Sequence, residues 1–158
     1  MNAAVTVFFL IIKVFSLYFL AVSLFGLCRR RTPEPAARLR RFAVLIAARN
    51  EESCIAGLIE SLRAQHYPPE LVDIWVLPNN CTDRTAEAAR RAGAQVLEMP
   101  ASVRSKGAAL HTAAKALLRS TRNYDAFCVF DADNEADPAF LSEMNRALDR
   151  TAIVKSRI

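Results

Sequence analysis

From residue 42 onward, short apolar segments alternate with longer segments in which apolar residues recur at helical spacing. The short segments are rich in Val, Ile, Leu and Phe, as expected of strands that are buried on both faces. The longer segments have the pattern of helices that cover a sheet. The predicted strands are 42–47, 72–77, 94–99 and 126–130, and the predicted helices are 51–65, 82–91, 105–119 and 138–149. This alternation predicts an α/β fold built on a mainly parallel sheet.

A separate apolar run, residues 3–28, precedes the alternating region. It is long enough to cross a hydrocarbon core of about 30 Å, which requires about 20 helical residues. Lys13 costs roughly 2.5–3.5 kcal/mol near the middle of such a helix. The sixteen Val, Ile, Leu and Phe residues of the run outweigh that cost, at about −0.3 to −0.6 kcal/mol each. We therefore expect a transmembrane anchor over residues 1–28, rather than a signal peptide, whose positive charge would precede its apolar core.

A basic segment, residues 29–41, follows the apolar run and reads as a juxtamembrane linker. Its six arginines are Arg29, Arg30, Arg31, Arg38, Arg40 and Arg41. Anionic lipid headgroups account for them, and for much of the net charge of +5, so we expect a membrane partner and no nucleic acid. By the positive-inside rule the N-terminus lies outside and the domain lies in the cytoplasm. The chain is thus predicted to be a single-pass protein of the inner or plasma membrane.

Polar clusters follow three of the four predicted strands, at residues 48–52, 79–85 and 131–137. Ligands of open parallel sheets bind outside the carboxyl ends of the strands, so the three clusters are expected to converge on one crevice. Taken singly, the first two clusters are also explained as helix caps, because Asn, Asp, Thr and Glu are common in the first turn.

Asp131 and Asp133 are harder to explain as caps. Two carboxylates that directly follow a buried strand repel each other unless a cation or donor lies between them, and their oxygens suit Mg²⁺ or Mn²⁺. A calcium EF-hand loop is excluded, because its sixth position would be Ala136 rather than glycine. There is no GxxxxGK[ST] or GxGxxG motif, which argues against P-loop and dinucleotide-binding proteins. Lys106 and Gly107, at the start of a predicted helix, offer a weaker phosphate signal.

Together these segments resemble the family-2 glycosyltransferases, which are inverting, nucleotide-sugar-dependent enzymes of the GT-A fold. The matching stretches are 44–52 (VLIAARNEE), 79–86 (NNCTDRTA), 106–110 (KGAAL) and 130–134 (FDADN). Four motifs in the family's order make the resemblance specific, and it runs from about residue 42 to residue 148. It implies that residues 42–158 are a partial GT-A domain, containing the nucleotide-binding half.

The resemblance also implies roles for individual residues. The nucleoside would be held by Arg49, Asn50, Glu51, Asn79 and Asp83. Lys106 and Gly107 would lie near the diphosphate, Asp131 would approach the ribose or sugar, and Asp133 would ligate Mn²⁺ or Mg²⁺, with Asp131 as a second candidate ligand. A UDP-sugar is the favoured donor.

Three departures from the family stand out. Alanine replaces the usual proline at position 47, and asparagine replaces the usual aspartate at position 79, which removes a charged acceptor for the base. The family's catalytic carboxylate and its R-W-type motif come later, so the general base is expected beyond Ile158, and the chain is expected to be truncated before the acceptor-side motifs.

The predicted function is therefore glycosyl transfer to a polysaccharide, glycolipid or other cell-envelope acceptor, as in the membrane-anchored bacterial branch of the family. This chain would supply the donor-nucleotide and metal site and would be inactive alone. The alternative is a truncated, non-catalytic membrane protein that at most binds nucleotide.

Overall fold

The computed structural model describes residues 2–27 and 36–150. The chain divides into two compact units, Met1–Glu34 and Pro35–Ile158. Residues 29–35 of the expected linker 29–41 lie outside the described residues. The last eight residues of the chain, 151–158, also lie outside them.

The described part of the first unit, residues 2–27, forms the helix α1 (Ala3–Leu27). Its described side chains are all exposed, and Val5–Leu24 is long and apolar enough to cross a membrane. A signal sequence near an N-terminus can pass the same test of length and composition. The helix therefore agrees with the predicted anchor in length and composition only.

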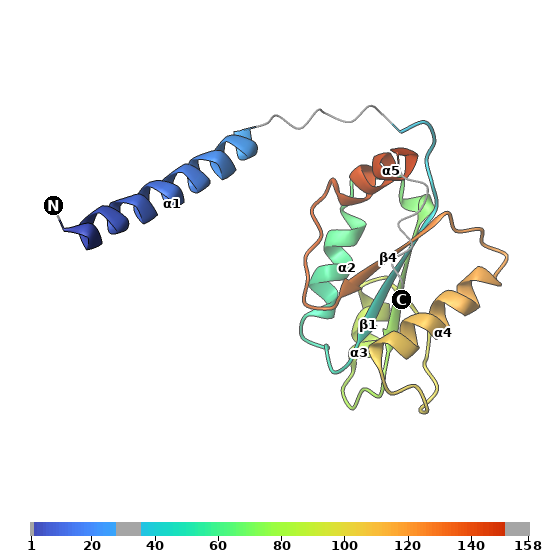
Figure 1. Cartoon of the computed structure of the whole chain (residues 1–158). Helices are drawn as coiled ribbons and strands as arrows, with labels where there is room; N and C mark the ends of the chain where they lie inside the picture. The colour runs from blue at the N-terminus through green and yellow to red at the C-terminus, as the bar shows by residue number, and fades with distance from the viewer. Residues whose placement is uncertain (1, 28–35, 151–158) are drawn as a thin grey trace. The chain divides into compact units, whose positions relative to one another are not determined.

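The second unit is a four-stranded parallel sheet with helices on both faces (Figure 1). The strand order is β3-β2-β1-β4, so β1 lies between β2 and β4. The elements are β1 (Phe42–Ala48), α2 (Ile55–Arg63), a 3₁₀ turn η1 (Pro69–Leu71), β2 (Val72–Pro78), α3 (Thr85–Arg91), β3 (Gln95–Val96), α4 (Lys106–Leu118), β4 (Ala126–Asp131) and α5 (Phe140–Arg150). The predicted α/β class and parallel sheet are confirmed.

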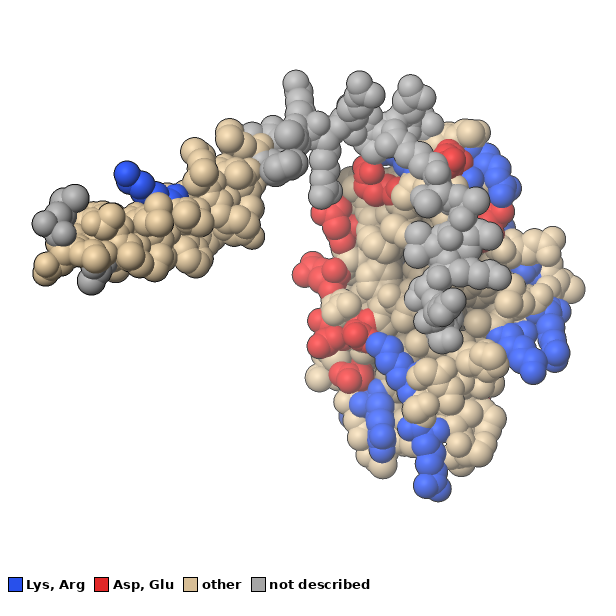
Figure 2. Space-filling view, in the orientation of Figure 1, with Lys and Arg blue, Asp and Glu red and all other residues tan. Residues whose placement is uncertain are grey.

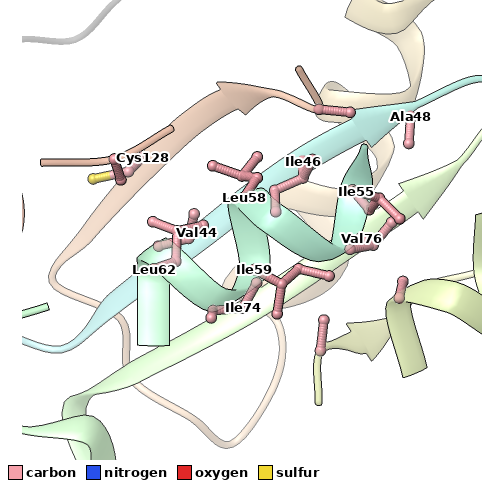
Figure 3. Packing of buried hydrophobic residues seen from close by; sticks show 14 of the residues in the cluster. Val44, Ile46, Ala48, Ile55, Leu58, Ile59, Leu62, Ile74, Val76 and Cys128 are labelled. Atoms are coloured by element: carbon pink, nitrogen blue, oxygen red, sulfur yellow. The ribbon is translucent and has the colours of Figure 1, made fainter. Parts of the chain in front are cut away.

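Alternation of side chains along the strands divides the core into two layers. On the first face, which we call the three-helix face, β1 side chains such as Val44 and Ile46 pack against α2, α3 and α5. Figure 3 shows Leu58, Ile59 and Leu62 of α2 pointing onto the strands there. On the opposite α4 face, Ala43, Leu45 and Leu77 pack against Leu110, Ala113 and Leu117 of α4.

The outer strand β4 is only partly covered. Val129 pairs with Leu45 of β1, so its side chain lies on the α4 face, yet it is 44% exposed. Within the described residues β4 has β1 as its partner on one side and no strand on the other. The sheet therefore presents an apolar edge on the α4 face.

Helices α2 and α3 begin later than their apolar patterns predicted, at Ile55 and Thr85 rather than at residues 51 and 82. The intervening residues form loops that bind each other instead of extending the helices. Strand β3 is also shorter than expected, because regular pairing with β2 covers only Gln95 and Val96 before a final bond from Leu97 N to Val76 O (2.9 Å).

Candidate functional site

The loops that follow β1, β2 and β4 lie at the carboxyl edge of the parallel sheet, where the sequence predicted a crevice. Two residues there, Asn50 (φ 60°) and Asn80 (φ 52°), adopt the left-handed backbone conformation. Non-glycine residues seldom do so, although asparagine does it more readily than most. Each one turns the chain sharply just after a buried strand, which keeps both loops at the edge of the sheet.

Several hydrogen bonds join the β1–α2 loop to the β2–α3 loop, and three of them involve backbone amides of predicted site residues or their neighbours. The amide of Glu51 donates to Thr85 Oγ1 (2.9 Å), and the amide of Glu52 donates to Asp83 Oδ2 (3.1 Å). In the other direction, the amide of Thr82 donates to Asn50 Oδ1 (2.8 Å). The first two polar clusters of the sequence thus form one connected structure.

Both carboxylate oxygens of Asp83 accept hydrogen bonds within these two loops. Its Oδ1 accepts hydrogen bonds from the Thr85 hydroxyl (2.5 Å) and the Thr85 amide (3.1 Å). The hydroxyl bond is the main reason that the pKa of Asp83 lies below its ordinary value, so the group is a carboxylate at neutral pH. Its binding to a nucleoside stays a prediction, whereas its part in joining the loops is direct.

Thr85 is fully buried and has the central place between the two loops. Sequence reasoning missed it, since a threonine at the start of a helix is ordinary. No pattern in one sequence distinguishes a cap from a residue that also binds a loop more than thirty positions earlier.

Asn79, at the end of β2, is buried beneath the site with 6% of its surface exposed. Its backbone amide donates to Ala48 O (2.9 Å), which continues the pairing of β2 with β1. Its side-chain carbonyl accepts from Asn80 Nδ2 (2.8 Å), and the same Nδ2 also donates to Val103 O (2.8 Å). The carbonyl that was expected to face a base therefore already has one partner within the protein.

Cationic side chains lie around these loops. Arg49 is exposed and forms no hydrogen bond or ion pair with the described residues, so it is available to a ligand. Arg84 forms an ion pair with Glu52 (3.0 Å) instead.

The start of α4 brings a lysine to the third polar cluster. Ser105 caps the helix by accepting from the Ala108 amide (3.2 Å), and Lys106 Nζ forms an ion pair with Asp131 Oδ1. Both side chains are about half exposed, at 49% and 57%. Gly107 is exposed, with open space where a Cβ would be, so the local packing does not require glycine.

Asp133 comes two residues after Asp131, in the loop that follows β4. It lines a cavity of about 550 Å³ together with Cys54 and Gly57 of the α2 region and Glu135 of its own loop. Its carboxylate has no hydrogen bond or ion pair with any described residue. The Cys54 thiol donates to Glu51 Oε2 (3.0 Å), and this bond, with burial, raises the pKa of Cys54 to about 11, so the thiol stays protonated.

The carboxylates of Asp131 and Asp133 are suitable ligands for Mg²⁺ or Mn²⁺, but two carboxylates do not complete the coordination shell of such an ion. Among the described residues no group of three or more His, Cys, Asp or Glu side chains is placed to hold a metal ion. Asp131 and Asp133 offer exposed carboxylate oxygens, of which Asp133's are unpaired. Hard divalent ions in phosphate-binding sites commonly take one or two carboxylates and complete their shell with phosphate oxygens and water. The residues present fit that arrangement.

Comparison with known proteins agrees with this geometry. Residues 43–157 match the family described as Glycosyl transferase family 2. The chain belongs to that family. The match begins inside β1 and covers all the motifs on which the resemblance rested, so the predicted family is confirmed.

Two curated relatives illustrate the similarity. The chain is 28% identical over 108 residues to "Probable glycosyltransferase YdaM" of Bacillus subtilis, which covers 64% of this chain and 24% of that protein. It is 30% identical over 92 residues to a "Beta-monoglucosyldiacylglycerol synthase" of Synechocystis, covering 57% and 19%. The chain thus spans about a quarter or less of these relatives.

Solved structures show the same fold. The mannosyltransferase PcManGT from Pyrobaculum calidifontis, solved with GDP-Man and Mn²⁺, matches with a TM-score of 0.66 and 21% identity, over 85% of this chain and 40% of that one. S. aureus TarS 1-349, solved with UDP, matches with a TM-score of 0.56 and 20% identity, over 70% and 32%. The GT-A fold of the glycosyltransferases is therefore confirmed.

Proposed function

We propose that this chain supplies the donor-nucleotide and metal site of a nucleotide-sugar-dependent glycosyltransferase. The observation that carries the proposal is the assembly at the carboxyl edge of the sheet. There the β1–α2 and β2–α3 loops are hydrogen-bonded together, and Lys106 meets Asp131. Membership of the family supports reading this edge as the donor side.

The joined loops are the part we assign to the nucleoside. Arg49 supplies an unpaired cation, and Asn50, Glu51 and Asp83 hold the loop backbones in place through the bonds to Thr82, Thr85 and Glu52. Asn79 lies beneath them. Because its carbonyl already accepts from Asn80, it offers a base a weaker acceptor than a carboxylate would. A UDP-sugar is the proposed donor.

Lys106, Gly107, Asp131 and Asp133 are the part we assign to the diphosphate. Phosphate oxygens compete with Asp131 for the Lys106 ammonium, and the exposed Gly107 leaves the first turn of α4 open to an anion. Asp133, with Asp131, would hold Mn²⁺ or Mg²⁺. When bound, that ion stabilises negative charge on a departing diphosphate. The Mn²⁺ in the PcManGT complex supports this ion class.

The acceptor is proposed to be a polysaccharide, a glycolipid or another cell-envelope molecule. The similarity to a glycolipid synthase and the apolar helix α1 support a place at the membrane. The arginines of residues 29–41 support a cytoplasmic position of the domain through the positive-inside rule. A reporter enzyme fused after Arg41 should be active only on the cytoplasmic side. Activity of the fusion outside the cell would contradict this topology.

Titration calorimetry of the full chain in detergent tests the donor site. UDP should bind weakly, and only when Mn²⁺ or Mg²⁺ is present. Asp133→Ala should abolish the metal dependence, because the ion loses an unpaired carboxylate ligand. Glu87→Ala, which removes an exposed carboxylate from α3, is the matched control and should bind like the parent. Binding that needs no metal, or that survives Asp133→Ala unchanged, would show that these aspartates are structural.

Asn79→Asp sharpens the same experiment. A carboxylate at this buried position should tighten UDP binding by about 1 kcal/mol, the scale of one improved hydrogen bond. Unchanged UDP affinity would remove position 79 from the base-binding residues.

A further inference from the structure

The outer side of α4 carries basic and apolar side chains and no acidic ones. His111, Lys115 and Leu118 follow one another at helical spacing and are all exposed, while Leu110 and Leu117 are buried against the sheet. There is no Asp or Glu anywhere in Lys106–Leu118. Leu118 is 68% exposed, a high value for a leucine on a folded domain.

Two segments at the end of α4 extend this surface. Arg119 caps the helix and Arg122 follows in the turn. The segment before β1 lies beside that turn, because Asp125 accepts from Arg38 Nη2 (2.8 Å) and from the Arg41 amide (2.8 Å). We call the resulting surface the basic end of the domain; it comprises Arg38, Leu39, Lys115, Leu118, Arg119 and Arg122.

The charges at the basic end do not cancel. Asp73 is nine-tenths buried and pairs with both Arg41 and Arg122, and Asp125 pairs with Arg38. Two further acids lie nearby. Glu70 lines a cavity with Arg41 and Arg122. Asp149 pairs with Arg40 (2.6 Å) and also interacts with the charge of Arg38. Lys115 and Arg119 are exposed and form no ion pair with the described residues. Figure 2 shows basic side chains gathered beside α4, away from the acidic side of the domain.

Two exposed leucines within a basic surface indicate the kind of partner. Leu39 is 57% exposed and Leu118 is 68% exposed, and each is flanked by arginine. Apolar side chains that enter the headgroup region, surrounded by Lys and Arg that contact lipid phosphates, are the chemistry of interfacial membrane binding.

We propose that the basic end docks on an anionic lipid surface. Leu39 and Leu118 enter the interface, and Lys115 and Arg119 contact lipid phosphates. The ten residues 28–37 join α1 to this end of the domain, and a chain of that length reaches at most about 35 Å. If α1 is in the bilayer, that short connection keeps the basic end at high local concentration near the same surface. The proposal rests on α1 as an anchor and does not depend on glycosyl transfer.

Fluorescence quenching in lipid nanodiscs tests the docking on the full chain. Leu118→Trp is incorporated into discs that contain brominated phosphatidylcholine, either alone or with about one third phosphatidylglycerol. The parent, whose one tryptophan is Trp75, gives the baseline. We expect at least a twofold increase in quenching of the added tryptophan in anionic discs, and its reversal at high salt.

Matched variants separate docking from general effects. Lys115→Gln with Arg119→Gln, in the Leu118→Trp protein, should abolish the added quenching without changing the unfolding midpoint, because both side chains are exposed and form no ion pair with residues 2–27 or 36–150. Arg90→Gln with Arg91→Gln, an exposed basic pair on α3, should leave it intact. Glu87→Trp, also on α3, should show no quenching.

Equal quenching of the added tryptophan in neutral and anionic discs, or none in anionic discs at low salt, would overturn the proposal. A chain that fails to enter either disc would overturn the anchor and the docking together. Neither result would affect UDP binding in detergent, so failure here is distinguishable from failure of the donor site.

Discussion

The two faces of the sheet differ in how they are held together. The three-helix face is an apolar layer in which Phe42, Leu58 and Leu141 are almost completely buried. The α4 face has a smaller apolar cluster, and a polar group completes it: Asp73 on β2, with Arg41, Arg122 and Tyr124 around it. Leu118 and Val129 stay exposed on or beside that face. The first face should therefore dominate stability, while the second is open to partners and sensitive to pH.

The largest effect should come from the three-helix face. Leu58→Ala removes a side chain with 1% exposure in the middle of α2 and should lower the free energy of unfolding by about 2–5 kcal/mol. Urea unfolding of the full chain in mild detergent, followed by circular dichroism, measures it. A loss below about 1 kcal/mol would mean that this face is not the main core.

Neighbouring leucines of α4 give a matched pair on the other face. Leu117→Ala, at 5% exposure, should cost about 2 kcal/mol, the lower end for a buried leucine, because the partly covered face can relax around the cavity. Leu118→Ala, at 68% exposure, should stay within about 0.5 kcal/mol of the parent. Equal losses at the two positions would show that the exposed side of α4 is covered in solution.

A smaller effect should follow from Asp73. Burial raises the pKa of this carboxyl, but hydrogen bonds from Arg122 and Tyr124, with the charges of Arg122 and Arg41, outweigh it and hold the pKa below its ordinary value. Because the folded pKa is lowered, the stabilisation is present above the unfolded pKa and is lost as pH falls through the folded one. Asp73→Asn should cost about 1 kcal/mol at neutral pH, since Arg122 is half exposed and screened.

The acid dependence checks this assignment. As the pH falls through the lowered folded pKa of Asp73, the stability of Asp73→Asn should converge on that of the parent, because the parent then loses the same interaction. Glu87→Gln, at an exposed position, should keep the parent's pH dependence. If Asp73→Asn remains equally destabilised at all pH values, the role of Asp73 is steric rather than ionic.

The position of the candidate site in the fold could be predicted from the sequence, but the partners of its side chains could not. Asn50, Glu51, Asn79 and Asp83 were expected at one edge, and the structure brings their loops together. The pairing of Lys106 with Asp131 was not foreseen, nor was the placement of Asp133 beside Cys54. Polar side chains carry no periodicity that reports their partners, because those partners come from loops far apart in the sequence.

Hydrophobic periodicity is a local property, and the sequence by itself determined what depends on it. That includes the type and order of the elements, the parallel sheet, the apolar helix before it, and the edge where the polar loops gather. The tertiary structure alone decided that Thr85 binds two loops, that Asn79 lends its carbonyl to Asn80, and that α4 has one open basic side. These contacts depend on which surfaces come together when segments far apart in the sequence pack. The pattern of residues along one chain contains no information on such contacts.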